Sequence, residues 1–402
     1  MKTATRYYRS LEEYTVLLGL AVAVIWANVA AHAYHGFAEY DFGTTPEFLG
    51  SHHVTVHYLV NDVLMYLFFF LVILEMRRDL LRGGDLGAWR ARFSTLFATL
   101  GGVLVPFAIY KYLAYKYVPW ITEGFAIPMA TDIVFANLVA RIVFGRGNHP
   151  AKVFLRALAI LDDLITTLVI AVFYGDDVDW LGLLPWALSL LMLTAFMNAH
   201  GVRNKYTYMV LSVPAWVMFS HFGVHTAIAA IVFAWFIPHG KSAEQNFFPG
   251  PHCWTPDARD EVLENIEHWL RRGVVPLTLM AFGLVNGGIA IGLGGSTTYI
   301  VLAGLLIGKP VGIVLGTLIG ALVGFGRPDG VSWRDVLIVG FAASIGFTVS
   351  IFVADIALED PTFLSHAKLG ATMSFIGGAI AILIGKVTRN DAELDSSAVA
   401  SH

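Results

Sequence analysis

Long apolar runs recur along the chain and alternate with short polar stretches. A run of about 20 apolar residues can cross a hydrocarbon core of ~30 Å as a helix, with the polar stretches at the membrane surfaces. The pattern predicts an all-α polytopic membrane protein of twelve transmembrane helices, at residues 14–33, 58–75, 93–115, 125–143, 152–174, 180–199, 206–219, 222–237, 273–290, 298–325, 335–356 and 368–386. We expect one transmembrane domain over 1–402, with a cytoplasmic loop at 238–272 and a short disordered C-terminal tail at 388–402.

The composition is that of a membrane protein. Hydrophobic residues make up 56% of the chain and charged residues only 14%, against about 25% charged residues in a typical soluble protein. The net charge is −4 and no basic block is present, so nothing predicts a nucleic-acid partner. The single cysteine, Cys253, excludes an internal disulfide and a zinc site made of several cysteines.

The distribution of Lys and Arg between the predicted loops indicates the orientation. With both termini in the cytoplasm, twenty of these residues lie on the cytoplasmic side, and three lie on the other side: Lys111, Lys116 and Lys368. Cytoplasmic loops of membrane proteins carry the excess of positive charge. The pattern therefore predicts an even number of spans with the N and C termini in the cytoplasm.

Three aspartates and a lysine lie inside the predicted spans: Asp132, Asp162, Asp163 and Lys309. Each charge at mid-membrane costs about 2.5–3.5 kcal/mol, so such residues are rare unless a function retains them. One interpretation is that they form ion pairs or neutral acids that only hold helices together. The excess of carboxylates over the single lysine favours the other interpretation, a binding site for a cation or a proton.

Residues that interrupt helices stand close to these charges. Pro128 precedes Thr131 and Asp132 in the fourth span and has no N–H group to donate to a helix. Gly340 and Gly346 loosen the eleventh span. Broken helices expose carbonyl groups and helix ends, which line ion sites within membranes. The pattern thus predicts two discontinuous helices at the site.

Asp162 and Asp163 are neighbours in the fifth span and cannot share one direction. Successive residues of a helix point about 100° apart, so the two carboxylates need different partners. One can face the broken helix that carries Asp132, and the other can reach Lys309. A buried carboxylate binds a proton or a hard metal cation, but not both at once. This competition is what a cation/proton exchanger requires.

Seven segments together resemble the NhaA family of sodium/proton antiporters. In chain order they are "NDVLMYLFFFLVILEMRRDL" (61–80), "EGFAIPMATDIVFA" (123–136), "LRALAILDDL" (155–164), "FGVHTAIAAIVFAWFIP" (222–238), "VNGGIAI" (285–291), "LLIGKPVGI" (305–313) and "SIGFTVSIFVA" (344–354). The similarity covers most of residues 14–386, and the segments are highly specific in combination.

The resemblance implies an electrogenic sodium or lithium/proton antiporter of the bacterial inner membrane, without a cofactor and without enzymatic activity. Two protons would enter for each cation exported, by alternating access at the buried aspartates. The third to fifth and the tenth to twelfth spans would form inverted-topology repeats, with the fourth and eleventh discontinuous and crossed. The loop near 43–57 would hold a β-hairpin at a homodimer contact.

The same resemblance implies roles for individual residues. Asp163 would be the main sodium ligand, with Asp132 and Thr131 beside it. Asp162 would pair with Lys309 during part of the cycle. A pH response would lie at the cytoplasmic mouth, at Glu75, Arg77, Arg78, Asp79, Glu267 and His268. An ordinary solvated helix end is the alternative for the residues near position 75.

The sequence departs from the usual family pattern around the aspartates. Ile165 and Thr166 follow the aspartate pair where Gly-Ala is usual, and Asn137 follows "TDIVFA" where Leu is usual. Arg156 lies seven residues before Asp163 and either extends toward the cytoplasm or raises the local potential. These departures leave ion selectivity open. The alternative is a proton-coupled transporter of the same fold for potassium or a small solute.

An intramembrane aspartyl protease belongs to a different class of function. Such an enzyme needs two carboxylates that share a proton, and Asp132 and Asp163 could do so. Lys309 would compete for that proton, and a "GxGD" segment is absent from the sequence. The sequence therefore favours transport over peptide cleavage.

Overall fold

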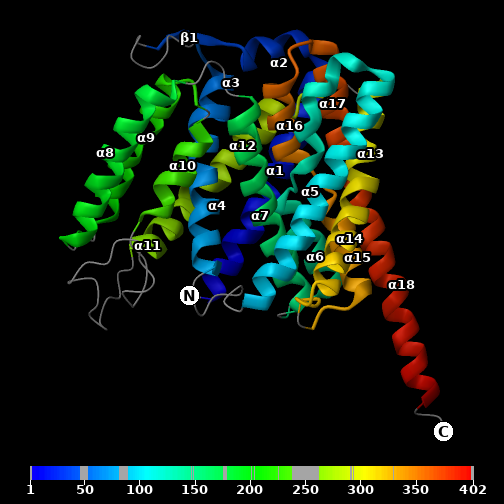
Figure 1. The fold of residues 1–402 in the computed structure, drawn as a ribbon. Helices are drawn as coiled ribbons and strands as arrows, with labels where there is room; N and C mark the ends of the chain where they lie inside the picture. The colour runs from blue at the N-terminus through cyan, green and yellow to red at the C-terminus, as the bar shows by residue number, and fades with distance from the viewer. Residues whose placement is uncertain are drawn as a thin grey trace. The chain divides into compact units, whose positions relative to one another are not determined.

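The computed structural model of the 402-residue chain is mostly helical (Figure 1) and describes residues 2–45, 53–80, 89–145, 147, 149–174, 179–200, 202, 204–224, 226–237, 262–289, 292, 294–328 and 330–399. Its internal contacts divide the chain into two compact units. Unit 1 comprises Met1–Gly84 and Thr167–Ile291, and unit 2 comprises Asp85–Thr166 and Gly292–His402. Each unit is thus made of two separated pieces of chain, where the sequence predicts one domain over 1–402.

Unit 1 begins with helices α1 (Lys2–Val29) and α2 (Ala31–Ala38). The strands β1 (Asp41–Thr44) and β2 (His53–Thr55) follow and pair as an antiparallel hairpin. The short helix α3 (Val56–Tyr58) and a π-helical turn, Leu59–Leu64, continue into α4 (Met65–Leu80). The second piece of the unit contains α8 (Trp180–Ala199), α9 (Lys205–His221), α10 (Thr226–Trp235), α11 (Val262–Trp269), a π-helical turn at Leu270–Val274 and α12 (Val275–Asn286).

Helix α1 packs closely on α12 in the interior of unit 1. A Cβ atom at Gly283 would lie only 2.8 Å from the carbonyl oxygen of Val16, so a residue with a side chain does not fit there. The hydroxyl of Tyr34 reaches the carbonyl oxygens of Leu284 (2.9 Å) and Val285 (2.5 Å). These carbonyls lie in the last turn of α12, where a helix leaves them without an intrahelical partner. The N-terminal helices therefore complete the packing of α12.

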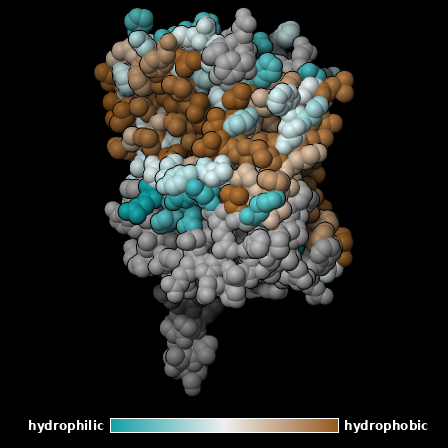
Figure 2. All heavy atoms as spheres, turned by 90° about the vertical axis from the view of Figure 1, so that its left-hand side faces the viewer, coloured by the Kyte–Doolittle hydropathy of each residue, from teal (hydrophilic) through white to brown (hydrophobic). Residues whose placement is uncertain are grey.

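Helices α8 and α9 present an apolar surface. Figure 2 looks onto the side on which they lie, and hydrophobic side chains gather over much of its described area. Large exposed side chains include Leu181, Met192 and Phe196 on α8 and Val210 on α9. Within Leu181–Ala199, only 17% of the most apolar 18-residue stretch is buried. Soluble proteins seldom expose so broad an apolar patch, so this surface fits a hydrocarbon surrounding.

The first piece of unit 2 contains α5 (Trp89–Tyr117), a 3₁₀ helix at Pro119–Met129, α6 (Ile133–Phe144) and the part of α7 (Pro150–Phe173) up to Thr166. Its second piece contains α13 (Ser296–Ala303), a π-helical turn at Gly304–Gly308, α14 (Lys309–Leu322), α15 (Trp333–Ala343), α16 (Phe347–Ala357), α17 (Pro361–Met373) and α18 (Phe375–Val399). Helices α5 and α14 lie side by side. A Cβ atom at Gly312 of α14 would clash with the carbonyl oxygen of Gly101 in α5, so glycine allows this close approach.

Two segments of unit 2 are interrupted, and the two interruptions contact each other. The first segment passes from the 3₁₀ helix through extended backbone at Ala130 into α6. The second bends by 48° between α15 and α16. The N–H of Asp132 donates to the carbonyl of Ile345 (2.6 Å), and the Ser350 hydroxyl donates to the carbonyl of Ile127 (2.6 Å). Backbone groups that lose their helical partners at a break need others, and each break here supplies them to the other.

The residues expected to interrupt the helices occupy different positions. Pro128 lies in the 3₁₀ helix just before the extended backbone, and Gly346 directly precedes α16. Gly340 lies inside the regular helix α15 instead of at a break. A Cβ atom there would lie 2.9 Å from the Cα atom of Pro310. The small size of Gly340 therefore serves the close packing of α15 on α14.

The described residues include five helical segments that are long and apolar enough to cross a membrane: Val56–Glu75, Arg92–Tyr117, Leu181–Ala199, Ser296–Leu322 and Pro361–Val387. The bent pair α15 and α16 adds a sixth if the two helices form one span. The fourth predicted span coincides with an interrupted segment, and the fifth coincides with α7, a continuous helix that carries several charged residues. A mostly helical fold with several apolar helices is thus confirmed, and the count of twelve spans stays a prediction.

Two polar segments predicted from the sequence fall at the margins of the described structure. Residues 238–261 of the expected cytoplasmic loop lie outside the described residues, which resume with α11. In the expected disordered tail at 388–402, α18 continues as a helix to Val399. The Ala, Glu and Leu residues of this segment are good helix formers, so the helix does not end with the apolar run.

Candidate functional site

Asp162 and Asp163 lie on α7, in the part of this helix that belongs to unit 2. Asp162 is fully buried, and Asp163 is 1% exposed. Because neighbouring residues of a helix point about 100° apart, the two carboxylates enter different surroundings. Their contacts differ accordingly.

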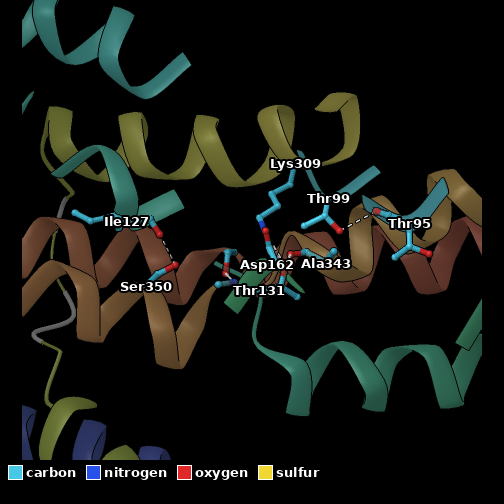
Figure 3. A network of polar contacts seen from close by, with 10 residues as sticks. Thr95, Thr99, Ile127, Thr131, Asp162, Lys309, Ala343 and Ser350 are labelled. Atoms are coloured by element: carbon cyan, nitrogen blue, oxygen red, sulfur yellow. Dashed lines mark hydrogen bonds and ion pairs between the residues drawn. The ribbon is translucent and has the colours of Figure 1, made fainter. Parts of the chain in front are cut away.

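Asp162 forms an ion pair with Lys309 of α14, and both side chains are fully buried (Figure 3). The Thr131 hydroxyl joins this pair, because it lies 2.7 Å from Asp162 Oδ2 and accepts a hydrogen bond of 2.9 Å from Lys309 Nζ. It also lies 2.9 Å from the carbonyl oxygen of Ala343, at the end of α15. A hydroxyl has a single hydrogen, so Thr131 donates either to Asp162 or to Ala343 at any moment.

A π-helical turn positions Lys309. The turn, Gly304–Gly308, ends directly before Lys309, which is the first residue of α14 and is followed by Pro310. A Cβ atom at Gly304 would lie 2.7 Å from the Cβ atom of Pro128, so the turn packs on the interruption of the first segment. Such turns are rare and frequently occur at functional sites. The lysine is thereby aimed at the place where both broken segments meet.

Asp132 accepts four hydrogen bonds from the beginnings of two helices. Its Oδ1 atom accepts from the N–H groups of Val134 (3.0 Å) and Phe135 (3.2 Å), which makes Asp132 the N-cap of α6. Its Oδ2 atom accepts from the N–H (3.0 Å) and the hydroxyl (2.6 Å) of Thr348 in α16. The first N–H groups of a helix lack partners and carry partial positive charge, which a carboxylate stabilises. Asp132 thus links the two broken segments.

Asp163 lies close enough to Asp162, Asp132 and Lys309 to interact with their charges. A carboxylate removed from water in this way is costly unless a proton, a cation or a charged partner compensates it. Carboxylate, hydroxyl and carbonyl oxygens are the ligands that hard metal cations prefer. Together with Thr131, these four residues, here called the aspartate cluster, carry the groups that bind a hard cation or protons.

A second group of charges lies in unit 1, where the resemblance implies a pH response. Glu75 of α4 forms an ion pair with Arg271 in the π-helical turn before α12, with side-chain exposures of 9% and 7%. The guanidinium of Arg77 donates to the carbonyls of Ala234 (3.4 Å) and Ile237, at the end of α10. Burial lowers the pKa of Arg77 to about 10, so Arg77 stays charged at neutral pH. We call Glu75, Arg77 and Arg271 the arginine cluster.

The other residues expected in the pH response have different positions. Glu267 is buried on α11, and His268 beside it is exposed. The side chains of Arg78 and Asp79 lie outside the described part of the chain.

Two partners of the cluster residues are not identified from the sequence. Thr348 donates hydrogen bonds to Asp132. Its position two residues after Gly346 could have identified it, because polar side chains are frequent at the start of a helix. Arg271 pairs with Glu75, and its sequence neighbourhood resembles an ordinary basic helix end. Nothing in the sequence distinguishes it from Arg272.

The residues that depart from the family pattern are also placed by the structure. Thr166 lies on α7, one turn after the aspartate pair, and is fully buried. Ile165, Asn137 and Arg156 are partly buried. Thr166 is therefore the most deeply buried of the four residues that depart from the family pattern, and its side chain carries a hydroxyl group.

Known proteins similar to this chain share one description. The family described as Na+/H+ antiporter 1 matches residues 9–388. A relative from Jannaschia sp. (strain CCS1) is described as "Na(+)/H(+) antiporter NhaA". It is 37% identical over an alignment of 421 positions, which covers 96% of this chain and 98% of the relative. A relative of the same description from Geobacter sulfurreducens is 37% identical over 388 residues, 94% of this chain and 96% of the relative.

A solved structure resembles this chain in fold. It is the sodium proton antiporter MjNhaP1 from Methanocaldococcus jannaschii at pH 8, with a TM-score of 0.53 and 16% identity. The similarity covers 93% of this chain and 89% of that one. At this level of identity, the likeness concerns the arrangement of the helices alone.

Proposed function

This chain belongs to the Na+/H+ antiporter 1 family and is a sodium/proton antiporter, and we propose that it exchanges the two ions at the aspartate cluster of unit 2. It is a multi-pass membrane transporter rather than an enzyme, and sodium ions and protons are its substrates. We propose secondary active transport, in which protons that enter the cell drive sodium or lithium out by alternating access.

The single observation that supports this site is the fully buried ion pair of Asp162 and Lys309 beside Asp163. Three carboxylates and one ammonium share a buried region, so the cluster gains stability from a cation or from protons. We assign one exchanged proton to Asp163 and the other to the Asp162–Lys309 pair, which titrates as a unit. Two protons for one sodium ion make the exchange electrogenic.

We further propose that Asp163 is the main ligand of the sodium ion, with Asp132 and Thr131 nearby. The hydrogen bonds of Asp132 to the beginnings of α6 and α16 support a role that links cation binding to the broken segments. A change in the charge of Asp163 alters the attraction between these helix ends and the cluster. The broken segments would then move as the cluster changes its occupant.

The proposed topology has twelve spans in the bacterial inner membrane, with both termini in the cytoplasm. The bent pair α15 and α16 supports a pair of discontinuous, crossed helices within inverted-topology repeats. The excess of Lys and Arg in alternate loops supports the orientation. The hairpin of β1 and β2 supports a homodimer contact through the loop near 43–57, and the apolar surface of α8 and α9 supports contact with lipid.

The arginine cluster is proposed to carry the pH response. Its arginines keep their charge at neutral and mildly alkaline pH, so its titrating group would be Glu75, with Glu267 of α11 as a second carboxylate outside the cluster. A buried carboxylate whose partner keeps a fixed charge changes the balance of the cluster when it binds a proton. Such a change would act on the ends of α4, α10 and α12.

Proteoliposomes that contain the purified protein and a ΔpH-sensitive dye test the function. We expect added sodium and lithium to dissipate the ΔpH, added potassium to leave it unchanged, and Asp163→Asn to abolish the sodium response. Asp360→Asn is the matched control, because Asp360 caps the exposed start of α17 and asparagine caps equally well. A sodium response that survives in Asp163→Asn would refute the proposed site.

The alternative is a proton-coupled transporter of the same fold for potassium or a small solute. The residues Ile165, Thr166, Asn137 and Arg156 favour it, because they depart from the usual pattern close to the aspartates. A potassium response as large as the sodium response in the same proteoliposomes would establish it.

A further inference from the structure

Thr166 carries a hydroxyl group whose position has no structural explanation in its own helix. The residue is fully buried, and its Oγ1 atom has no hydrogen-bond partner among the residues that the structure describes. Leaving a buried hydroxyl without a partner costs free energy, and such groups are uncommon in folded proteins. A group of this kind is expected where a ligand supplies the missing interaction.

Four other buried threonines within helices satisfy their hydroxyls locally. Each of them donates to the carbonyl oxygen four residues earlier: Thr99 to Thr95, Thr194 to Leu190, Thr278 to Val274 and Thr317 to Ile313. This is the ordinary solution for a threonine inside a helix. The hydroxyl of Thr166 makes no such bond to Asp162, although the same solution is open to it.

The position of Thr166 on α7 places it beside both aspartates. It follows Asp163 by three residues and Asp162 by four, the two spacings at which helical side chains are neighbours. At about 100° per residue, Thr166 points about 40° away from Asp162 and about 60° away from Asp163. Its direction therefore lies between those of the two carboxylates, one turn further along the helix.

We propose that the Thr166 hydroxyl oxygen is a ligand of the transported cation, together with the carboxylate of Asp163. This inference rests on the proposed function, because it assumes that the cation binds at the aspartate cluster. A hydroxyl oxygen offers lone pairs to a hard cation, while its hydrogen remains available to a carbonyl or a carboxylate. The bound cation thus supplies the interaction that Thr166 lacks in the protein alone.

An additional neutral oxygen bears on the choice between sodium and lithium. Selection between cations of one charge depends on the number of ligands and on the size of the site. Lithium is the smaller ion and is satisfied by fewer oxygens, whereas sodium uses more ligands at longer distances. Thr166 therefore contributes more to sodium binding than to lithium binding, at a position where Ala is usual in the family that the chain resembles.

Three variants of the full-length protein in proteoliposomes test this role. Thr166→Val keeps the shape and removes the oxygen, Thr166→Ser restores an oxygen, and Thr317→Val is the matched control. Thr317 is also fully buried, but its hydroxyl is bound within its own helix. We expect Thr166→Val to raise the KM for sodium about tenfold, the size expected for the loss of one ligand to a charged group, and to raise the KM for lithium less.

Two further measurements separate a ligand from a packing residue. Sodium should raise the unfolding temperature of the wild type, of Thr166→Ser and of Thr317→Val in detergent, because a ligand stabilises the state that binds it. The same sodium concentration should raise that of Thr166→Val much less. Without sodium, Thr166→Val should unfold at or above the wild-type temperature, because valine leaves no unsatisfied hydroxyl.

The outcomes distinguish this inference from the proposed function. A KM for sodium in Thr166→Val within about twofold of the Thr317→Val value would overturn the inference, while the loss of transport in Asp163→Asn would still support the site. An equal rise of the two KM values would overturn the selectivity assigned to Thr166. Transport of sodium by Asp163→Asn would overturn both proposals.

Discussion

The aspartate cluster of unit 2 and the arginine cluster of unit 1 are both buried ion pairs, but their cations differ. Lys309 pairs with Asp162 at full burial, and Arg271 pairs with Glu75 at side-chain exposures of 7% and 9%. A buried ammonium can release its proton, whereas a guanidinium stays charged. The ion pair of the aspartate cluster can therefore change charge at either partner, and that of the arginine cluster only at Glu75.

The two clusters also differ in the backbone groups that they bind. Asp132 accepts from the N–H groups at the beginnings of two helices, and Arg77 donates to carbonyls at the end of α10. Anions are stabilised at helix N-termini and cations at C-termini. In unit 2 the helix ends surround the proposed exchange site. In unit 1 they are held in place by a charge that does not change.

Removal of the basic partner from each pair should produce the largest contrast in stability. Lys309→Gln leaves Asp162 buried without its cation, and breaking a fully buried pair costs about 3–5 kcal/mol. Arg271→Gln leaves Glu75 in a slightly more exposed place, where we expect a loss of about 2 kcal/mol. Thermal unfolding in detergent, followed by tryptophan fluorescence, measures both. Equal losses would contradict the difference in burial between the clusters.

Exchange of lysine for arginine, and of arginine for lysine, should affect the pH dependence of transport differently in the two clusters. Lys309→Arg keeps the charge, but the guanidinium holds its proton to a higher pH than an ammonium does. In the proposed exchange the Asp162–Lys309 pair releases a proton before the cation binds, so we expect the onset of transport to move by about one pH unit toward alkaline pH. The dye assay over a series of pH values measures the onset.

Arg271→Lys is the matched exchange in unit 1. The lysine would still be charged at the pH of the onset, so the pair with Glu75 persists and the onset should stay in place. A shift with Arg271→Lys and none with Lys309→Arg would show that the onset depends on the basic partner of Glu75 and not on the Asp162–Lys309 pair.

The sequence predicts the charged members of the site better than their partners. Asp162, Asp163 and Lys309 stand out because a charge within an apolar run is costly and therefore rare. Three of the four donors to Asp132 are backbone N–H groups, those of Val134, Phe135 and Thr348. Every residue except proline has such a group, so no sequence signal marks the ones that bind.

For the fold, the sequence likewise predicts the helices but not how they pack. Hydrophobic runs identify helices but not the surfaces on which they pack, so they do not reveal two units that each combine separated pieces of chain. Glycine shows the same limit, because Gly346 precedes a helix after a break whereas Gly340 allows contact with Pro310 inside a regular helix. The sequence alone does not distinguish a glycine at a helix break from a glycine that allows close packing, because the packed neighbour is known only from the structure.

Substitution of Arg77 should have the smallest effect and sharpens the contrast with Lys309. Arg77→Met removes the donor to the carbonyls of Ala234 and Ile237, and we expect a loss of about 1–2 kcal/mol in stability. Arg77→Lys should recover about half of this loss, because a cation at a helix C-terminus remains favourable without the planar guanidinium. The KM for sodium should stay at the wild-type value in both variants, because Arg77 binds the end of a helix and not the ion. A rise of that KM in Arg77→Lys, at unchanged unfolding temperature, would show that the arginine cluster acts on cation binding itself.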